Sequence, residues 1–264
     1  MNYKHLEKKR ESIRTVLKKM FSITEDAASN EEIRDRILSG GKITGTNMVV
    51  MVCAILIASV GLNTNSIAVI IGAMLISPLM GSILAIAYGT VANDGYLIER
   101  HTTGFAVQIV MSIATATIYF LLSPIKEPTE QLLARTNPNF FDVLIAVAGG
   151  IAGIVGQTRQ DKANNIIPGV AIATALMPPL CTCGYAIANL NLRMLLGALY
   201  LFTINTYFIY ISSGVMLTLL KTPKVKAMTP EEWKKTKKKM YRNTLLVLLP
   251  IILIAFTMKG DRKI

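Results

Sequence analysis

The stretch IAVIIGAMLISPLMGSILAIAYGTV, residues 67–91, decides the fold. It is apolar and long enough to cross a bilayer, whose hydrocarbon core of about 30 Å needs about 20 helical residues. Ser77-Pro78 and Gly81 interrupt it, because a proline inside a helix removes a backbone hydrogen bond and a glycine adds backbone freedom. A serine followed by a proline is also typical of the start of a new helix. The stretch therefore predicts two half-helices that meet near the membrane centre.

A second interrupted stretch lies about a hundred residues further on, at residues 166–188, IIPGVAIATALMPPLCTCGYAIA. When Pro78 is placed on Pro179, the two stretches align without a gap, and Leu79 falls on Leu180. This agreement predicts an internal duplication with a second broken helix. Interrupted spans at matched positions of two halves are typical of transport sites. The alternative is that the prolines only kink packed helices, as prolines in membrane spans often do.

The composition is that of a membrane protein that crosses the bilayer several times. The chain has 264 residues, of which 52% are hydrophobic, and its mean hydropathy is +0.46. The first 46 residues are polar, so we expect no cleavable signal peptide. The net charge of +12 lies mostly in blocks beside apolar spans, which favours contact with anionic lipid and not with nucleic acid. The three cysteines lie in apolar spans, which argues against a disulfide framework.

The distribution of basic residues predicts the orientation of the chain in the membrane. With a cytoplasmic N-terminus, most of the 28 Lys and Arg residues fall on the cytoplasmic side, as the positive-inside rule requires. The first three spans then start inside and the next three start outside, which predicts an inverted 3+3 repeat. The seven expected transmembrane helices cover residues 47–62, 67–91, 104–122, 141–156, 166–188, 194–219 and 243–258.

We expect four parts along the chain. Residues 1–45 form cytoplasmic or interfacial N-terminal helices: an amphipathic one over 2–21, and one that a Ser29/Glu32 capping box opens and Gly40-Gly41 ends. Membrane repeat 1 then covers 46–122 and membrane repeat 2 covers 123–220. Residues 221–264 form a basic cytoplasmic loop and the seventh helix.

The expected site lies where the two broken helices, numbers 2 and 5 in the membrane, meet. Half-helix N-termini favour an anion, whereas the carbonyls that end the preceding half-helices favour a cation such as Na⁺. The sequence does not decide between them. No ionisable side chain lies at the expected membrane centre, which disfavours a proton relay. The predicted substrate-binding residues are Ser77, Pro78, Leu79, Met80, Gly81, Ser82, Thr174, Pro178, Pro179, Cys181 and Thr182.

The other polar residues do not indicate a metal-binding or catalytic site. Two cysteines, Cys181 and Cys183, fall short of the usual four ligands of a metal site, so we interpret them as packing residues. Residues 94–101 read as a mixed-charge cytoplasmic turn. Gln108 and Asn205 would line a polar path or bond neighbouring helices. The chain contains no nucleophile with a base and no phosphate-binding loop, so we expect neither an enzyme nor a cofactor.

Two strings resemble the signature regions of a known family of prokaryotic membrane proteins. They are GTNMVVMVCAILIASVGLNTNSIAVIIGAMLISPLMGSI, residues 45–83, and GVAIATALMPPLCTCGYAIA, residues 169–188. Both are similar to the family named domain of unknown function 389, once labelled an uncharacterised hydrophobic domain, over about 33–220. Ser82 stands where many relatives carry proline, which concerns the second half-helix. The family name implies no substrate.

Three functions fit these observations. The leading hypothesis is an integral transporter of a small solute or ion in the inner cell membrane, with a midplane site between the two broken helices. The second is an ion channel in which several subunits surround a pore. The third is a membrane scaffold or sensor without transport, whose basic segments bind anionic lipid or a partner. We expect a homo-oligomer.

Overall fold

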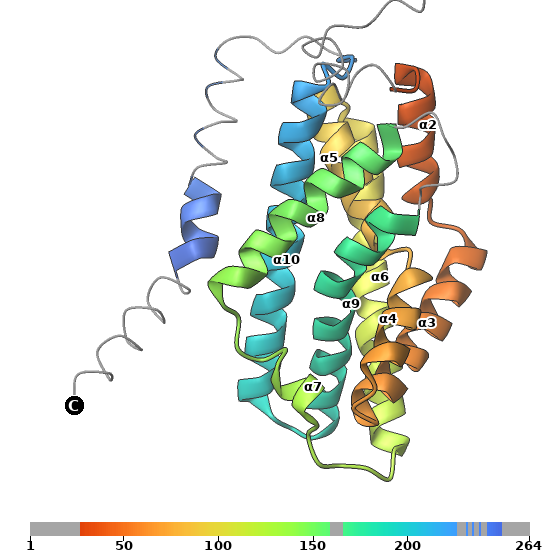
Figure 1. Cartoon of the computed structure of the whole chain (residues 1–264), viewed down its shortest axis with the longest axis vertical. Helices are drawn as coiled ribbons and strands as arrows, with labels where there is room; N and C mark the ends of the chain where they lie inside the picture. The colour runs from red at the N-terminus through yellow and green to blue at the C-terminus, as the bar shows by residue number, and fades with distance from the viewer. Residues whose placement is uncertain are drawn as a thin grey trace, which may run out of the picture.

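The computed structural model shows an all-α bundle (Figure 1). It describes residues 27–158 and 166–225, together with 231, 234, 238 and 242–249, and of 166–175 it describes the backbone alone. The predicted helix over 2–21 lies outside the described residues. The helices are α2 (Asn30–Gly40), α3 (Gly45–Asn63), α4 (Ile67–Leu75), α5 (Leu79–Ala92), α6 (Gly95–Leu122), α7 (Glu130–Leu133), α8 (Phe140–Thr158), α9 (Ile166–Ala188) and α10 (Leu192–Leu219).

Four of these helices, α3, α6, α8 and α10, are long and apolar enough to cross a membrane. The pair α4 and α5, bent by 47° at a short break, makes a fifth span if it is taken as one. The chain is therefore a multi-pass membrane protein by length and composition. For α9, only the apolar part Leu176–Ala188 is described with its side chains. Of the predicted seventh helix, residues 242–249 are helical and the remainder lies outside the described residues.

The first half of the bundle contains α2 to α6. The N-cap of α2 is Ser29, whose hydroxyl accepts a hydrogen bond from the Glu32 N–H at 3.2 Å, and Gly41 ends the helix. The predicted Ser29 cap and glycine stop are thus confirmed, and of the capping box the bond to the Ser29 hydroxyl is present. This helix packs along α5 through Ile33 and Ile37, which are buried. The α2–α5 pair is accordingly part of the packed bundle (Figure 1).

The turn predicted over 94–101 is wrong, because these residues belong almost entirely to α6. Asp94 is the N-cap, and its carboxylate accepts from the Leu97 N–H at 3.1 Å. The helix then runs for 28 residues. One side of this polar first part packs on other helices, which buries His101. The apolar span predicted from residue 104 is therefore the second part of a longer helix.

The centre of the bundle is α9, which packs against α3, α4, α5, α6, α8 and α10. Every side chain from Leu176 to Ala186 is buried. When α4 and α5 are taken as one span, the successive spans from α3 to α10 alternate in direction along the long axis, with α8 crossing obliquely (Figure 1). The inverted repeat and the duplication stay predictions.

Candidate functional site

The break between α4 and α5 is the irregular feature that the sequence predicts at Pro78. The last turn of α4 tightens, since Ile76 N–H bonds to the Ala73 carbonyl at 3.3 Å and Ser77 N–H to the Met74 carbonyl at 3.2 Å. Pro78 has no N–H to continue the backbone hydrogen bonds of the helix. The first half-helix boundary is confirmed, although α5 begins one residue later than predicted, with Pro78 at the N-cap.

The break leaves the Leu75 carbonyl without a helical donor. In a helix, the Leu75 carbonyl would accept from residue 78 or 79. Pro78 has no N–H, and the Leu79 N–H is directed to the Ser77 hydroxyl at 3.5 Å. Leu75 and Ile76 are 46% and 45% exposed, and Ser77 and Pro78 are half-buried. The break therefore lies at the periphery of the single chain.

The first turn of α5, which follows the break, is in contact with the end of α2 and the linker between α2 and α3. A Cβ added to Gly81 would overlap the backbone of Gly40, and one added to Gly41 would lie 2.7 Å from the Gly81 carbonyl oxygen. Only glycine permits so close an approach of two backbones. The first turn of α5 thus rests directly on the residues that end α2, a contact that we call the glycine contact (Gly40, Gly41 and Gly81).

The second predicted break is wrong, because α9 continues without interruption through Pro178 and Pro179. The two prolines lack N–H groups, so the carbonyls of residues 174 and 175 lose their helical donors. A helix inside a membrane bundle tolerates this loss when its neighbours hold it in place. Pro178 and Pro179 are buried in the centre of the bundle, where α9 has neighbours on several sides. Packing around α9 therefore keeps it in one piece.

The hydroxyl groups predicted to bind a substrate are largely engaged inside the protein. Ser82 is fully buried and donates to Gln108 Oε1 at 2.9 Å, which joins α5 to α6. Thr182 is fully buried and donates to the Pro178 carbonyl at 2.9 Å. Cys181 lies against the Ile55 carbonyl, with an S–O distance of 3.9 Å. These three residues do not line an accessible space.

The predicted site residues consequently fall into two groups. The helices that carry them are in contact, because α9 packs on both α4 and α5. The residues of the first group are partly exposed at the break: Ser77, Pro78, Met80 and Gly81. The residues of the second group are buried: Leu79, Ser82, Pro178, Pro179, Cys181 and Thr182. The side chain of Thr174 lies outside the described residues.

The sequence interpretation missed a polar group of α6 beside the glycine contact. His101 is 5% exposed, and its Nδ1 lies 3.1 Å from the Gly41 carbonyl oxygen. Because a carbonyl oxygen only accepts, Nδ1 carries a proton. Leu97, His101, Phe105, Gln108 and Ser112 are all buried on this helix. Their spacing of three or four residues is the signal of one helical face.

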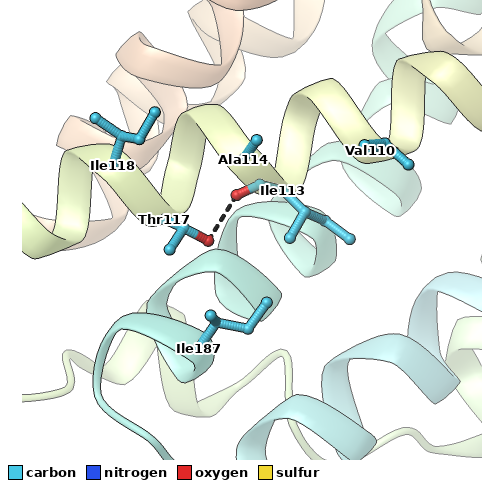
Figure 2. Close-up of a pocket in the computed structure, with 6 residues that line it drawn as sticks. All are labelled: Val110, Ile113, Ala114, Thr117, Ile118 and Ile187. Carbon is cyan, nitrogen blue, oxygen red and sulfur yellow. Dashed lines mark hydrogen bonds between the residues drawn. The ribbon is translucent and has the colours of Figure 1, made fainter.

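Two cavities lie at the surface of α6. The first, of about 480 Å³, is an apolar groove between α6 and α9 (Figure 2). Its polar group, the Thr117 hydroxyl, donates to the Ile113 carbonyl at 2.7 Å, so the groove suits a lipid chain. The second, of about 370 Å³, lies between α2 and α6 and is lined by Asp35, Leu38, Ser39, Lys42, Leu97, Arg100 and His101.

Comparison with known proteins places the chain in a family. The sequence profile of the family described as "Domain of unknown function (DUF389)" matches residues 74–211. An uncharacterized protein of Methanocaldococcus jannaschii is 25% identical over 250 residues, which is 94% of this chain and 72% of the relative. No solved structure matches. The matched residues are more than half of the chain and include the α4–α5 break and Pro178-Pro179, and the chain therefore belongs to the family of domain of unknown function 389.

Proposed function

We propose that this protein is a homo-oligomeric membrane channel for a small ion or solute, with the α4–α5 break lining the pathway. The observation that carries the proposal is the exposed side of the break, at Leu75 to Pro78. Hydrocarbon cannot satisfy an interrupted backbone, so an interrupted helix at membrane depth needs protein or water beside it. Among the described residues, the end of α2 and the linker contact one side of the break, and Leu75 and Ile76 remain exposed on the other. Further copies of the chain around a water-filled path would cover the other.

The break supplies the groups that a pathway needs. The Leu75 carbonyl has no helical donor, and the Ser77 hydroxyl is half-buried. Carbonyl and hydroxyl oxygens are the groups that line ion-selective pores. The N-terminal turn of α5 adds N–H groups at the break, which leaves the sign of the charge open.

The alternative transporter mechanism, with a midplane site inside one chain, has less support. It needs an accessible space between the segments around Pro78 and Pro179. The residues from Pro178 to Thr182 are buried, and neither of the two cavities described above touches them. We therefore place the pathway between subunits and not within one. The proposal further places the protein in the inner cell membrane, with its N-terminus in the cytoplasm and without an enzymatic activity.

Flux through the reconstituted protein tests the proposal. Ser77→Cys, in a background with Cys53→Ser, introduces a thiol at the break, while Cys181 and Cys183 remain buried. We expect purified protein in proteoliposomes to conduct small ions, and a charged thiol reagent to block that flux in the Ser77→Cys variant. The matched control is Val107→Cys, whose parent residue is 46% exposed on α6 and is not part of the break.

Two results would contradict the proposal. One is the absence of flux above empty liposomes for both small cations and small anions, which would leave a scaffold or sensor role. The other is equal block in both cysteine variants, since the reagent would then act independently of the break. Native mass spectrometry of the purified protein should show more than one copy of the chain in the complex.

A further inference from the structure

The cleft between α2 and α6 has no place in the proposed pathway and carries a different chemistry. It lies at the end of α2, beside the linker, and its volume is about 370 Å³. This is at the lower end of the range for small-molecule sites, about 300–1,000 Å³. Asp35, Ser39, Lys42 and Arg100 are exposed, so the cleft is open to the outside. A small polar group could reach it.

The charges of the cleft favour an anion. Lys42 and Arg100 are cationic, and Asp35 is the single carboxylate among its lining residues. The Ser39 hydroxyl donates to the Arg36 carbonyl at 3.0 Å, so it offers no hydrogen to a ligand. The guanidinium and ammonium groups are the two side chains that proteins use most to bind phosphate. One net positive charge suits a phosphodiester, which carries one negative charge, better than a phosphate dianion.

The position of the cleft along the helices matches the headgroup level of a membrane. Lys42 precedes α3, which starts at Gly45, and α6 continues past His101 into its apolar part. Basic residues at the ends of spans lie where lipid headgroups lie. Leu38 and Leu97 add an apolar wall, as a lipid with its glycerol backbone at this level requires. The cleft thus combines two cations with an apolar side at the membrane boundary.

We propose that the cleft of α2, the linker and α6 binds a phosphate group, carried by a membrane lipid headgroup or by free phosphate. Lys42 and Arg100 hold the phosphate oxygens, and Leu38 and Leu97 contact the adjoining carbon atoms. His101 positions the linker through its hydrogen bond to the Gly41 carbonyl. The charge balance favours the lipid phosphodiester of the two sources. This inference is independent of conduction, because it concerns other residues and a different readout.

Lipid titration of the purified full chain tests this proposal. The probes are phosphatidylglycerol and phosphatidylcholine, counted as bound molecules by native mass spectrometry, and inorganic phosphate, measured by calorimetry. The variant Lys42→Gln/Arg100→Gln removes both cations. We expect it to weaken the tightest phosphatidylglycerol binding by about tenfold or more, since two charge-assisted contacts are lost. Wild-type protein should bind inorganic phosphate weakly.

A charge-matched control separates the cleft from general surface attraction. Arg34→Gln/Lys221→Gln removes the same charge from exposed residues that do not line the cleft. We expect lipid binding within about twofold of wild type there. If the cleft variant does not fold, Arg100→Gln alone serves, because Arg100 is exposed. Its thermal midpoint should match that of wild type.

Each outcome decides between the sources or rejects the site. Loss of phosphatidylglycerol binding in the cleft variant alone supports the lipid headgroup. Saturable inorganic phosphate binding that displaces the lipid, and that the cleft variant loses, supports the free anion. Equal losses in the cleft and control variants, or unchanged binding in both, would overturn the proposal.

Discussion

Two similar proline-containing stretches of this chain have different structures. At Pro78 the span divides into α4 and α5 with a bend of 47°, whereas α9 runs through Pro178 and Pro179 as one helix. The number of prolines does not explain this difference, since α9 has two and stays continuous, whereas the α4–α5 stretch has one and breaks. The difference lies in the neighbours: the first turn of α5 rests on Gly40 and Gly41, and α9 is enclosed by six helices. Tertiary packing decides whether a proline breaks a helix.

The largest effect should come from the glycine contact. Gly81→Ala places a methyl group on the backbone of Gly40, which cannot yield by a rotamer change. We expect a loss of about 3 kcal/mol or more in the free energy of unfolding, at the upper end of overpacking effects. Thermal denaturation in detergent measures it.

The matched control for this prediction is Gly72→Ala on α4. A Cβ there meets nothing within 4 Å, so alanine should stabilise α4 by about 0.5–1 kcal/mol. Similar losses from the two substitutions would show that the glycine contact does not hold the break.

The next largest effect is expected at the side-chain hydroxyl groups of the two stretches, because the hydrogen bonds of Ser82 and Thr182 should differ in their contribution to stability. Ser82→Ala leaves the buried Gln108 acceptor without its donor, at an expected cost of about 1–3 kcal/mol. Thr182→Val removes a bond within a single helix and should cost less than about 1 kcal/mol. Chemical unfolding of both variants compares them directly. A greater loss from Thr182→Val would place the more important polar contact in α9.

A smaller effect is expected where α6 passes the linker. A Cβ on Gly104 would overlap the end of the Ile43 side chain. This side chain can rotate, so Gly104→Ala should cost about 0.5–1.5 kcal/mol, the cost of a shifted rotamer. Adding Ile43→Val removes Cδ1, the nearer overlapping atom, and leaves Cγ1, 2.7 Å from the added methyl group, to yield by a small rotation, so it should restore most of the thermal midpoint. Failure of this rescue would mean that the backbone of the linker also moves.

The smallest effect should follow from removing the proline at the break. Pro78→Ala restores an N–H group, but the glycine contact remains. We therefore expect the bend between α4 and α5 to persist, with an unchanged distance between spin labels at Ala68→Cys and Tyr96→Cys in a Cys53→Ser background. The reference is the same pair of spin labels in protein that keeps Pro78. A longer distance, as in a straight helix, would show that the proline itself makes the bend.

Local patterns predicted much of this fold, and long-range packing accounts for what they missed. The Ser29 cap and the break before Leu79 depend on neighbouring residues, and both are found. The burial of His101 depends on Gly41, sixty residues away, and charge-rich sequence around it concealed the helical face. The burial of Pro178 to Thr182 has the same kind of cause, because the packing around Pro179 cannot be read from its neighbours in sequence.

The glycine contact also couples α2, which has an exposed face, to α5, which is largely buried. Backbone meets backbone at Gly40 and Gly81, so no flexible side chain between them can absorb a displacement. In the proposed channel, any rearrangement of α5 during gating would therefore carry the end of α2 along with it. The fluorescence of a label on the polar, exposed face of α2, for example at Glu31, would then report movements at the break, although the label lies outside the proposed pathway.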